Sequence, residues 1–313
     1  METRALRYFQ AAAERGSYSR AAEFLRVSQP AVSRQISKLE QDLGTALFRR
    51  HGHGVTLTDA GRILLERSQL ALRQLDQTRA EIRGGKGGPS GVISFALPPA
   101  AGYFLAPPLV ARFGAEFPNV FLRIVGGFSG YIQEWLARGQ VDIACLHDPL
   151  PQRGFEFTPL VKEEVFLVGR PTDEISRRDH VRIADLPRLP LILPSRPNAS
   201  RRLLDGWIAE KGISLSVKLE ADDHSIIRGL LRRGIGFSLL TRSGFDADLR
   251  DSEVEAWPFR PRAFWRLTLV RSANARQSDM MAAFIRTVRE VARELSRSGL
   301  WAGKSVDRPE GLR

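Results

Sequence analysis

The chain of 313 residues contains one cysteine and five histidines. A single cysteine excludes an intrachain disulfide and a zinc site built on cysteine ligands. Cys145 lies in the apolar run VDIACLH, where we expect a buried strand and a packing role for the thiol. This scarcity of cysteine favours the reducing environment of the cytoplasm.

Long apolar runs are missing as well. No stretch of about 18 apolar residues is present, so we expect no membrane-spanning helix. The first 17 residues mix Arg with Glu and lack the apolar core of a signal peptide. The chain is therefore expected to be cytoplasmic and to have no membrane partner.

Common catalytic motifs are also missing. The sequence has no GxSxG between a strand and a helix and no HExxH, and GGKGG at 84–88 lacks the Ser or Thr of a phosphate loop. His51 and His53 have no evident third ligand nearby, so a metal site is not expected there. We expect neither an enzyme nor a cofactor.

Positive charge is abundant, with 47 Lys and Arg against 35 Asp and Glu and a formal net charge of +12. Residues 1–90 hold 15 Lys and Arg against nine Asp and Glu, a net of +6, and the other 223 residues hold the remaining +6. Positive charge is thus denser at the N-terminal end, as a module that binds DNA phosphates requires.

Residues 17–37, SYSRAAEFLRVSQPAVSRQIS, are predicted to form two helices joined by a tight turn. Ser17 or Ser19 is expected to cap the first helix, Ser28 to cap the second, and Pro30 suits the second helix's first turn. The first helix would pack through Ala21, Ala22, Phe24 and Leu25. The second has an apolar stripe at helical spacing, Val32, Ile36, Leu39 and Leu43.

The other face of the second helix carries Gln, Arg and hydroxyl groups instead of the Glu–Lys pairs of an ordinary solvated face. Gln can pair with adenine, Arg with guanine, and Ser with a base or a phosphate. Periodicity alone is equally compatible with an ordinary amphipathic helix, but these residue types favour entry into a major groove. The predicted contacts are Ser28, Gln29, Pro30, Ser33, Arg34 and Ser37.

Residues 47–58 contain two short β-prone pieces around a glycine-containing turn, which predicts a hairpin, or wing. Its candidate DNA contacts are Arg49 and Arg50 for phosphates, and His51, His53 and Thr56 for the backbone or minor groove.

Thr58 can cap a long helix that reaches about Arg83. One side of this helix carries residues at the alternating spacing of a coiled-coil seam: Leu64, Ser68, Ala71, Leu75, Thr78 and Ile82. This seam favours dimerisation, and packing on the protein's own body is the alternative.

After the Gly-rich stretch 84–91, the pattern alternates between strands and helices, which predicts parallel α/β lobes with a ligand cleft at the carboxyl ends of strands. Expected strands are 92–97, 121–125, 141–146, 166–169, 191–193, 217–220 and 236–240, with extended segments at 254–259 and 265–271. Expected helices are 102–117, 131–138, 201–211, 225–233 and 279–295.

We assign the chain to five parts. These are a winged helix-turn-helix domain at 1–58, a linker and dimerisation helix at 59–83, a flexible hinge at 84–91, a ligand-binding domain at 92–300 and a tail at 301–313. The ligand-binding domain is expected to have one lobe at about 92–160 and 266–300 and another at about 161–265.

Three N-terminal segments resemble the LysR-type transcriptional regulators: ALRYF at 5–9, GSYSRAAEFLRVSQPAVSRQISKLEQDLGTALF at 16–48, and RR…GVTLTDAG at 49–61. The loops GFSG at 127–130 and GIGFSLL at 234–240 extend a looser resemblance over the rest of the chain. LPPAAG and GFSGYIQEWLARGQVDIACLHDP are similar to the nitrogen-assimilation-control-like branch of that family.

The resemblance implies an α/β fold with an N-terminal all-α winged helix-turn-helix and a two-lobed effector domain built like a periplasmic binding protein. It implies a homodimer or homotetramer that regulates transcription by binding promoter double-stranded DNA, with RNA polymerase as a partner of an activator. A small-molecule effector in the cleft would modulate that activity. The implied DNA contacts are those of the second helix, with Arg49 and Arg50.

Relatives commonly place Ser or Thr at the start of the first lobe's first helix, whereas this chain has PPAAG at 98–102. The two alanines remove a hydroxyl that would hold a ligand carboxylate, although backbone N–H groups there would still accept an anionic effector. Each candidate effector contact is equally well explained singly as a cap or a solvated loop residue. The candidates are Pro99, Ala100, Ala101, Ser129, His147, Ser195, Arg196 and Thr241.

Other protein classes fit the sequence less well. A solute-binding protein would leave residues 1–83 unexplained, and an architectural DNA protein that needs no ligand would not require about 220 residues of α/β domain. An α/β enzyme has no motif to support it. A ligand-responsive DNA-binding regulator is therefore the prediction.

Overall fold

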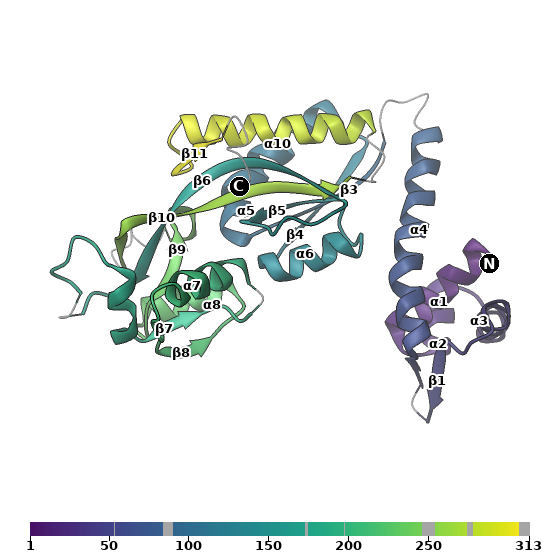
Figure 1. Ribbon diagram of the computed structural model, residues 1–313. Coiled ribbons are helices and arrows are strands. Elements are labelled where there is room, and N and C mark those ends of the chain that lie inside the picture. Colours follow the sequence, from purple (N-terminus) through teal and green to yellow (C-terminus); the bar gives the residue numbers. More distant parts are fainter. Residues whose placement is uncertain are drawn as a thin grey trace. The chain divides into compact units, whose positions relative to one another are not determined.

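The computed structural model describes residues 1–52, 54–83, 90–172, 175–196, 198–245, 254–273 and 278–306. They form two compact units, one made chiefly of residues 1–91 and one of the residues from 92 onward (Figure 1). Most of the predicted hinge, residues 84–89, lies outside the described residues. No helix in the described ranges is long and apolar enough to cross a membrane.

The N-terminal unit packs helices around one apolar core, which a hairpin closes. The ring of Phe48 in the hairpin lies 5.2 Å from the ring of Phe9 and 5.6 Å from that of Tyr18. In this unit the described elements are α1 (Thr3–Arg15), α2 (Tyr18–Leu25), α3 (Gln29–Leu43), β1 (Phe48–His51), β2 (Gly54–Leu57) and α4 (Asp59–Arg83).

Side-chain and backbone hydrogen bonds fix the hairpin to its neighbouring helices. The Glu40 carboxylate of α3 accepts the backbone N–H groups of Leu47, at 2.7 Å, and Phe48, at 3.2 Å. The Thr58 hydroxyl donates to the Ala46 carbonyl and accepts the Gly61 N–H, so Thr58 caps α4 as predicted. The polar ends of these elements are thereby satisfied where they meet.

Some local expectations for this unit are wrong. Ser17 caps α2, but the Ser28 side chain makes no capping hydrogen bond with α3. Val32, Ile36 and Leu39 are buried, whereas Leu43 lies in the last turn of α3, beyond the core, and is 42% exposed. Phe24 is also exposed, and its ring lies 4.0 Å beneath the Arg15 guanidinium instead of packing in the core.

The first half of α4 packs on its own domain. Ser68 and Leu72 are buried, and the Ser68 hydroxyl accepts a hydrogen bond from Gln10 of α1. Leu64 is half-buried against the same core, whereas Leu75 is exposed. The alternative of packing on the protein's own body therefore holds for the N-terminal part of the predicted seam.

The C-terminal unit is built on a mixed sheet with the order β11-β6-β10-β5-β3-β4, and β9 pairs with β6. β3 and β5 run parallel, as the βαβαβ pattern predicts, but β10 runs antiparallel to both β5 and β6. The strands are β3 (Gly91–Leu97), β4 (Val120–Gly126), β5 (Ile143–His147), β6 (Phe155–Gly169), β9 (Ser238–Thr241), β10 (Glu255–Ser272) and β11 (Gly303–Ser305). A purely parallel sheet is therefore wrong for this unit, because β6 and β10 pair antiparallel over most of their length.

Helices cover both faces of the first lobe. α5 (Pro99–Glu116) and α10 (Asp279–Arg297) pack on the face that contains Phe95 and Cys145, and α6 (Ser129–Ala137) packs on the opposite face, which contains Ala144. Cys145 is fully buried, and burial raises the pKa of its thiol, which fits the packing role predicted for it.

The second lobe lies at the far ends of β6 and β10 (Figure 1). Its further elements are the 3-10 helix η2 (Ile183–Arg188), β7 (Leu191–Leu193), α7 (Ala199–Ala209), β8 (Val217–Glu220), α8 (His224–Arg232) and η3 (Arg242–Gly244). Within this lobe, β7 and β8 form a parallel pair. The two long strands, β6 and β10, thus connect the lobes.

The predicted tail at 301–313 begins inside the fold instead. Trp301 is 1% exposed in the core of the first lobe, and Gly303–Ser305 form β11 along β6. The Val306 N–H continues this pairing by donating to the Leu160 carbonyl. The expectation failed because one large apolar side chain anchors a segment that is otherwise polar and Gly-containing.

Candidate functional site

The apolar face of α3 packs on the core of the N-terminal unit, so the opposite, polar face is accessible. Val32, Ile36 and Leu39 hold the helix, which leaves Gln29 and Arg34 exposed. Ser28 and Pro30 are exposed at the same end of the helix, and Ser33 and Ser37 are half-buried beside Arg34. The structure therefore brings all six predicted recognition-helix residues to one accessible surface, where amide, guanidinium and hydroxyl groups are available to base edges and phosphates.

The hairpin adds basic and polar side chains. Arg49 and Thr56 face each other in the register of β1 and β2, and both are exposed. His51 is exposed at the end of β1. His53 and the side chain of Arg50 lie outside the described residues. An exposed arginine on a hairpin beside a polar helix is an arrangement suited to phosphate contact.

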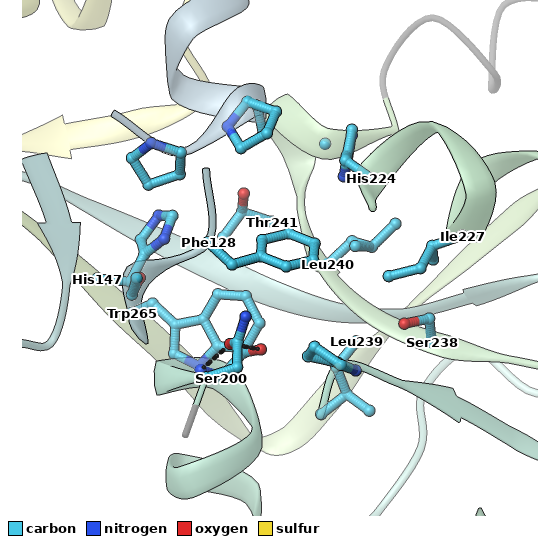
Figure 2. A pocket seen from close by; sticks show the side chains of 17 residues that line it. Phe128, His147, Ser200, His224, Ile227, Ser238, Leu239, Leu240, Thr241 and Trp265 are labelled. Atoms are coloured by element: carbon cyan, nitrogen blue, oxygen red, sulfur yellow. Dashed lines mark hydrogen bonds between the residues drawn. The ribbon is translucent and has the colours of Figure 1, made fainter. Parts of the chain in front are cut away.

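A pocket of about 580 Å³, part of it open to solvent, lies between the two lobes of the C-terminal unit. Helix starts from both lobes reach it: Pro99 and Ala100 of α5, Ser129 of α6, and His224 of α8. Figure 2 shows His224 among the side chains that line the pocket. Helix N-termini carry unpaired backbone N–H groups and partial positive charge, so their convergence favours a polar or anionic ligand group.

The pocket contains five of the eight predicted effector contacts: Pro99, Ala100, Ser129, His147 and Thr241. Three predictions need correction. Ala101 is buried in the core of the first lobe, because it faces the sheet rather than the pocket. The Ser195 hydroxyl donates to Asp222 at 2.5 Å, and the Arg196 guanidinium extends outward to Asp205 at 2.6 Å. Neither Ser195 nor Arg196 lines the pocket.

Several lining residues were missed by the sequence analysis. Asn198 caps α7 by accepting the Ser200 N–H, a pattern that Asn before a helix would have signalled. The other missed residues come from strands and helices whose relative placement the sequence does not give. They include Phe128, His224, Ile227, Ser238, Leu239, Leu240 and Trp265.

One wall of the pocket is joined to a buried carboxylate. His147, at the end of β5, places Nε2 3.3 Å from Oε2 of Glu163, which is 1% exposed in β6. Oε1 of Glu163 accepts hydrogen bonds from the Ser243 hydroxyl at 2.6 Å and the Trp301 indole at 2.9 Å. The Ser243 hydroxyl is in turn 2.8 Å from that of Thr241, which also lines the pocket. Glu163 therefore connects elements of both lobes.

The protonation of Glu163 follows from these contacts. Burial by itself raises the pKa of this carboxyl, but the hydrogen bonds and the charge of His147, with the hydrogen bonds from Ser243 and Trp301, hold the pKa below its ordinary value. The carboxylate is therefore ionised and buried, and it is stabilised by donors on three sides.

Metal ligands do not gather in the parts of the chain that the structure describes. No group of three or more His, Cys, Asp or Glu side chains is placed there to hold a metal ion.

Two family models match the chain. Residues 3–62 match the bacterial regulatory helix-turn-helix protein, lysR family, and residues 86–293 match the LysR substrate binding domain. The transcriptional regulator BbuR of Bordetella bronchiseptica is 32% identical over 308 residues, which cover 97% of this chain and 94% of BbuR. The nitrogen assimilation regulatory protein Nac of Escherichia coli is 30% identical over 244 residues, with coverage of 78% and 79%.

Solved structures include proteins with the same fold over nearly the whole chain. The crystal structure of full-length CbnR complexed with its target DNA has a TM-score of 0.66 and 25% sequence identity. It covers 93% of this chain and 100% of CbnR.

Proposed function

The chain belongs to the LysR family of transcription regulators, and on this premise we propose how its two sites divide the work. The exposed face of α3 reads base edges in the major groove of promoter DNA, and the hairpin contacts phosphates. The pocket between the lobes of the C-terminal unit binds a small-molecule effector. Occupancy of that pocket changes how the protein acts at its promoter.

The DNA-reading role is supported chiefly by the residue types left exposed on α3. Gln29 and Arg34 can each make bidentate hydrogen bonds to a base, and Ser33 and Ser37 can bond bases or phosphates. The CbnR complex with its target DNA is a relative in which a protein of this fold binds DNA. Arg49 and Arg50 add a positive charge that favours binding to any sequence.

The regulatory role is supported by the position of the pocket. Its walls come from both lobes, so an occupant that contacts Ser129 on one side and Thr241 on the other favours one arrangement of the lobes over others. A ligand shifts a conformational equilibrium only through such differential contacts. The Glu163 network crosses between the same lobes and transmits the pocket's state through His147 and Thr241.

The functional assembly is proposed to be a homodimer or homotetramer that α4 helps to join. Leu75 and Ile63 are exposed apolar side chains on this helix, at 42% and 64%. Pairing of two copies would cover them and would present two recognition helices to two half-sites. RNA polymerase is the further partner if the protein activates transcription.

A selection from random duplex DNA tests the proposal. The full chain at about 0.15 M salt should enrich one recurrent motif, organised as two half-sites about one helical turn or a multiple apart. The Arg34→Ala chain should lose enrichment at particular bases of that motif. A pool that stays unenriched with the native chain would contradict the DNA-reading role.

A further inference from the structure

Two residues that line the pocket each carry a buried polar atom with no hydrogen-bond partner among the described residues: the indole Nε1 of Trp265 and the hydroxyl Oγ of Ser238. Trp265 is 5% exposed and Ser238 is 1% exposed. Buried indole and hydroxyl groups are normally paired, because an unpaired donor loses its hydrogen bond to water without compensation. Both atoms belong to residues that line the same pocket, so one bound molecule is able to satisfy both.

The rest of the lining restricts what that molecule can be. Most of the described lining side chains are apolar, and none of these is Asp, Glu, Lys or Arg. His147 directs Nε2 to Glu163, and Asn198 Oδ1 already accepts hydrogen bonds from Ser200. A ligand with several charges would therefore be desolvated with few countercharges nearby, which is costly. The pocket therefore favours a ligand whose larger part is apolar.

The arrangement of the two donors suggests how a ligand would lie. Figure 2 shows Trp265 on the same side as His147, and Ser238 on the side of Ile227, with Phe128 and Leu240 between them. An acceptor near Trp265 and a second polar group near Ser238 would thus be separated by an apolar portion. The indole N–H is a donor only, so its partner must be an acceptor.

We propose that the effector is a small molecule with a mainly apolar body and one strong hydrogen-bond acceptor, a carboxylate or a carbonyl, that binds the Trp265 N–H. A second polar group of the effector pairs with the Ser238 hydroxyl. This inference rests on the proposed effector-binding role of the pocket and adds the chemical class of the ligand and two specificity-determining residues. An acceptor at the Trp265 end also lies on the side of His147, which joins the ligand to the Glu163 network.

Thermal unfolding of the full chain with a matched compound set tests the ligand class. The set contains aromatic and branched aliphatic bodies, each as its carboxylate, primary amide, primary amine and phosphate ester. Carboxylates or amides should raise the unfolding midpoint of the C-terminal unit, because a ligand that binds the folded state stabilises it. Stabilisation by carboxylates alone identifies a charged acceptor, and stabilisation by both identifies the carbonyl oxygen. Stabilisation by amines or phosphate esters alone, or by no member of the set, overturns the proposal.

Variants of the two residues test the contacts. Trp265→Phe keeps a large aromatic ring and removes the N–H, and it should weaken binding of the best stabilising compound about tenfold. Ser238→Ala should weaken it less. Trp257→Phe is the matched control, because Trp257 is a buried indole of the same lobe that does not line the pocket. Unchanged affinity in Trp265→Phe would overturn the assigned contact.

Two readouts separate this proposal from the function it rests on. The free Trp265→Phe protein loses core volume together with its unpaired N–H, so its unfolding midpoint should fall no further than that of Trp257→Phe, and a loss of affinity confined to Trp265→Phe is then not a loss of fold. Without ligand, the same Trp265→Phe preparation should bind the DNA motif with the affinity of the native chain. If the native chain binds no DNA motif, the proposed regulator is refuted. If it binds a motif but no carboxylate or amide of the compound set stabilises it, the ligand class alone is refuted.

Discussion

Nε2 of His147 lies 3.3 Å from Oε2 of Glu163, and this contact joins the wall of the proposed effector pocket to a buried carboxylate. An ionised carboxylate in such a position persists because donors surround it, and removing its charge leaves those donors without a strong acceptor. The pair therefore bears on both stability and regulation.

The first prediction concerns acid sensitivity. The pKa of Glu163 is below its ordinary value of 4.5 in the folded chain, so its contribution to stability is fully present above about pH 4.5 and is lost as pH falls through the lower, folded-state pKa. Glu163→Gln should lower the free energy of unfolding by about 2 kcal/mol at neutral pH and should flatten its dependence on pH in the acid range.

Urea unfolding of the C-terminal unit across that pH range measures both effects. Glu156→Gln is the control, because Glu156 lies on the same strand but is half exposed and pairs with Arg271 at 2.6 Å. Its loss should cost less than about 1 kcal/mol. Equal effects of the two substitutions would show that the buried network has no special role.

A second prediction concerns the recognition helix. Arg34→Ala should weaken binding to the specific site by about 1–3 kcal/mol if the guanidinium contacts a base, and Arg34→Lys should restore charge without restoring base preference. Binding of each variant to the selected motif and to single-base variants of it gives the measurement. Lys38→Ala is a control for charge, because Lys38 pairs with Glu2 at 2.8 Å. Native base preference in Arg34→Ala would exclude the contact.

The attachment of the hairpin gives a third prediction. A Cβ at Gly61 would lie 2.2 Å from the Leu47 carbonyl oxygen and 2.9 Å from a Leu57 methyl, so Gly61→Ala should destabilise the N-terminal unit by about 2 kcal/mol. At Gly52 no atom lies within 4 Å of such a Cβ, and Gly52→Ala should be nearly neutral. Thermal unfolding compares the two; similar midpoints would contradict the tight contact.

Trp301 provides a fourth prediction. Trp301→Ala removes a core side chain and a hydrogen bond to Glu163, and should lower the free energy of unfolding by about 3–5 kcal/mol. Calorimetry of the native and Trp301→Ala chains measures the difference. A Trp301→Ala protein as stable as the native chain would mean that the segment does not belong to the core.

Self-association supplies the fifth prediction. Leu75→Lys places a charge on an exposed part of α4, so it should shift the protein toward monomer while the helices remain folded. Leu72→Lys charges a buried position and should unfold the N-terminal unit instead. Light scattering with circular dichroism separates the two outcomes, and an unchanged mass for Leu75→Lys would exclude this surface from the interface.

The sequence predicted the parts of the fold that depend on local periodicity. Val32, Ile36 and Leu39 recur at helical spacing, and that spacing alone identified both the buried stripe and the polar face opposite it. Leu43 continued the spacing but lies beyond the end of the core, because periodicity states which side of a helix faces inward and not how far the core extends. The resemblance of segments within residues 5–61 to LysR-type regulators then predicted the DNA-binding fold, and the family's helix-turn-helix model matches residues 3–62.

The pocket was harder to predict because its residues come from distant strands. Ser129 and His147 follow strands in the sequence and were recognised on that ground, whereas Trp265 lies within a long strand that pairs with β6. In the sequence VKEEV at 161–165, strand alternation places Glu163 on the same face as Val161 and Val165 and Glu164 on the other face, but the sequence does not show what packs against each face. That difference follows from the alternation of faces in a sheet whose partners are set by tertiary structure.

Genome-wide footprinting of the native chain, followed by salt-titrated binding to the strongest site, tests the central claim most directly. The account predicts a small set of protected sites with paired half-sites, and specific binding that survives at physiological salt and responds to a ligand of the pocket. Diffuse protection that vanishes at moderate salt would show attraction to phosphates alone and would contradict a sequence-specific regulator.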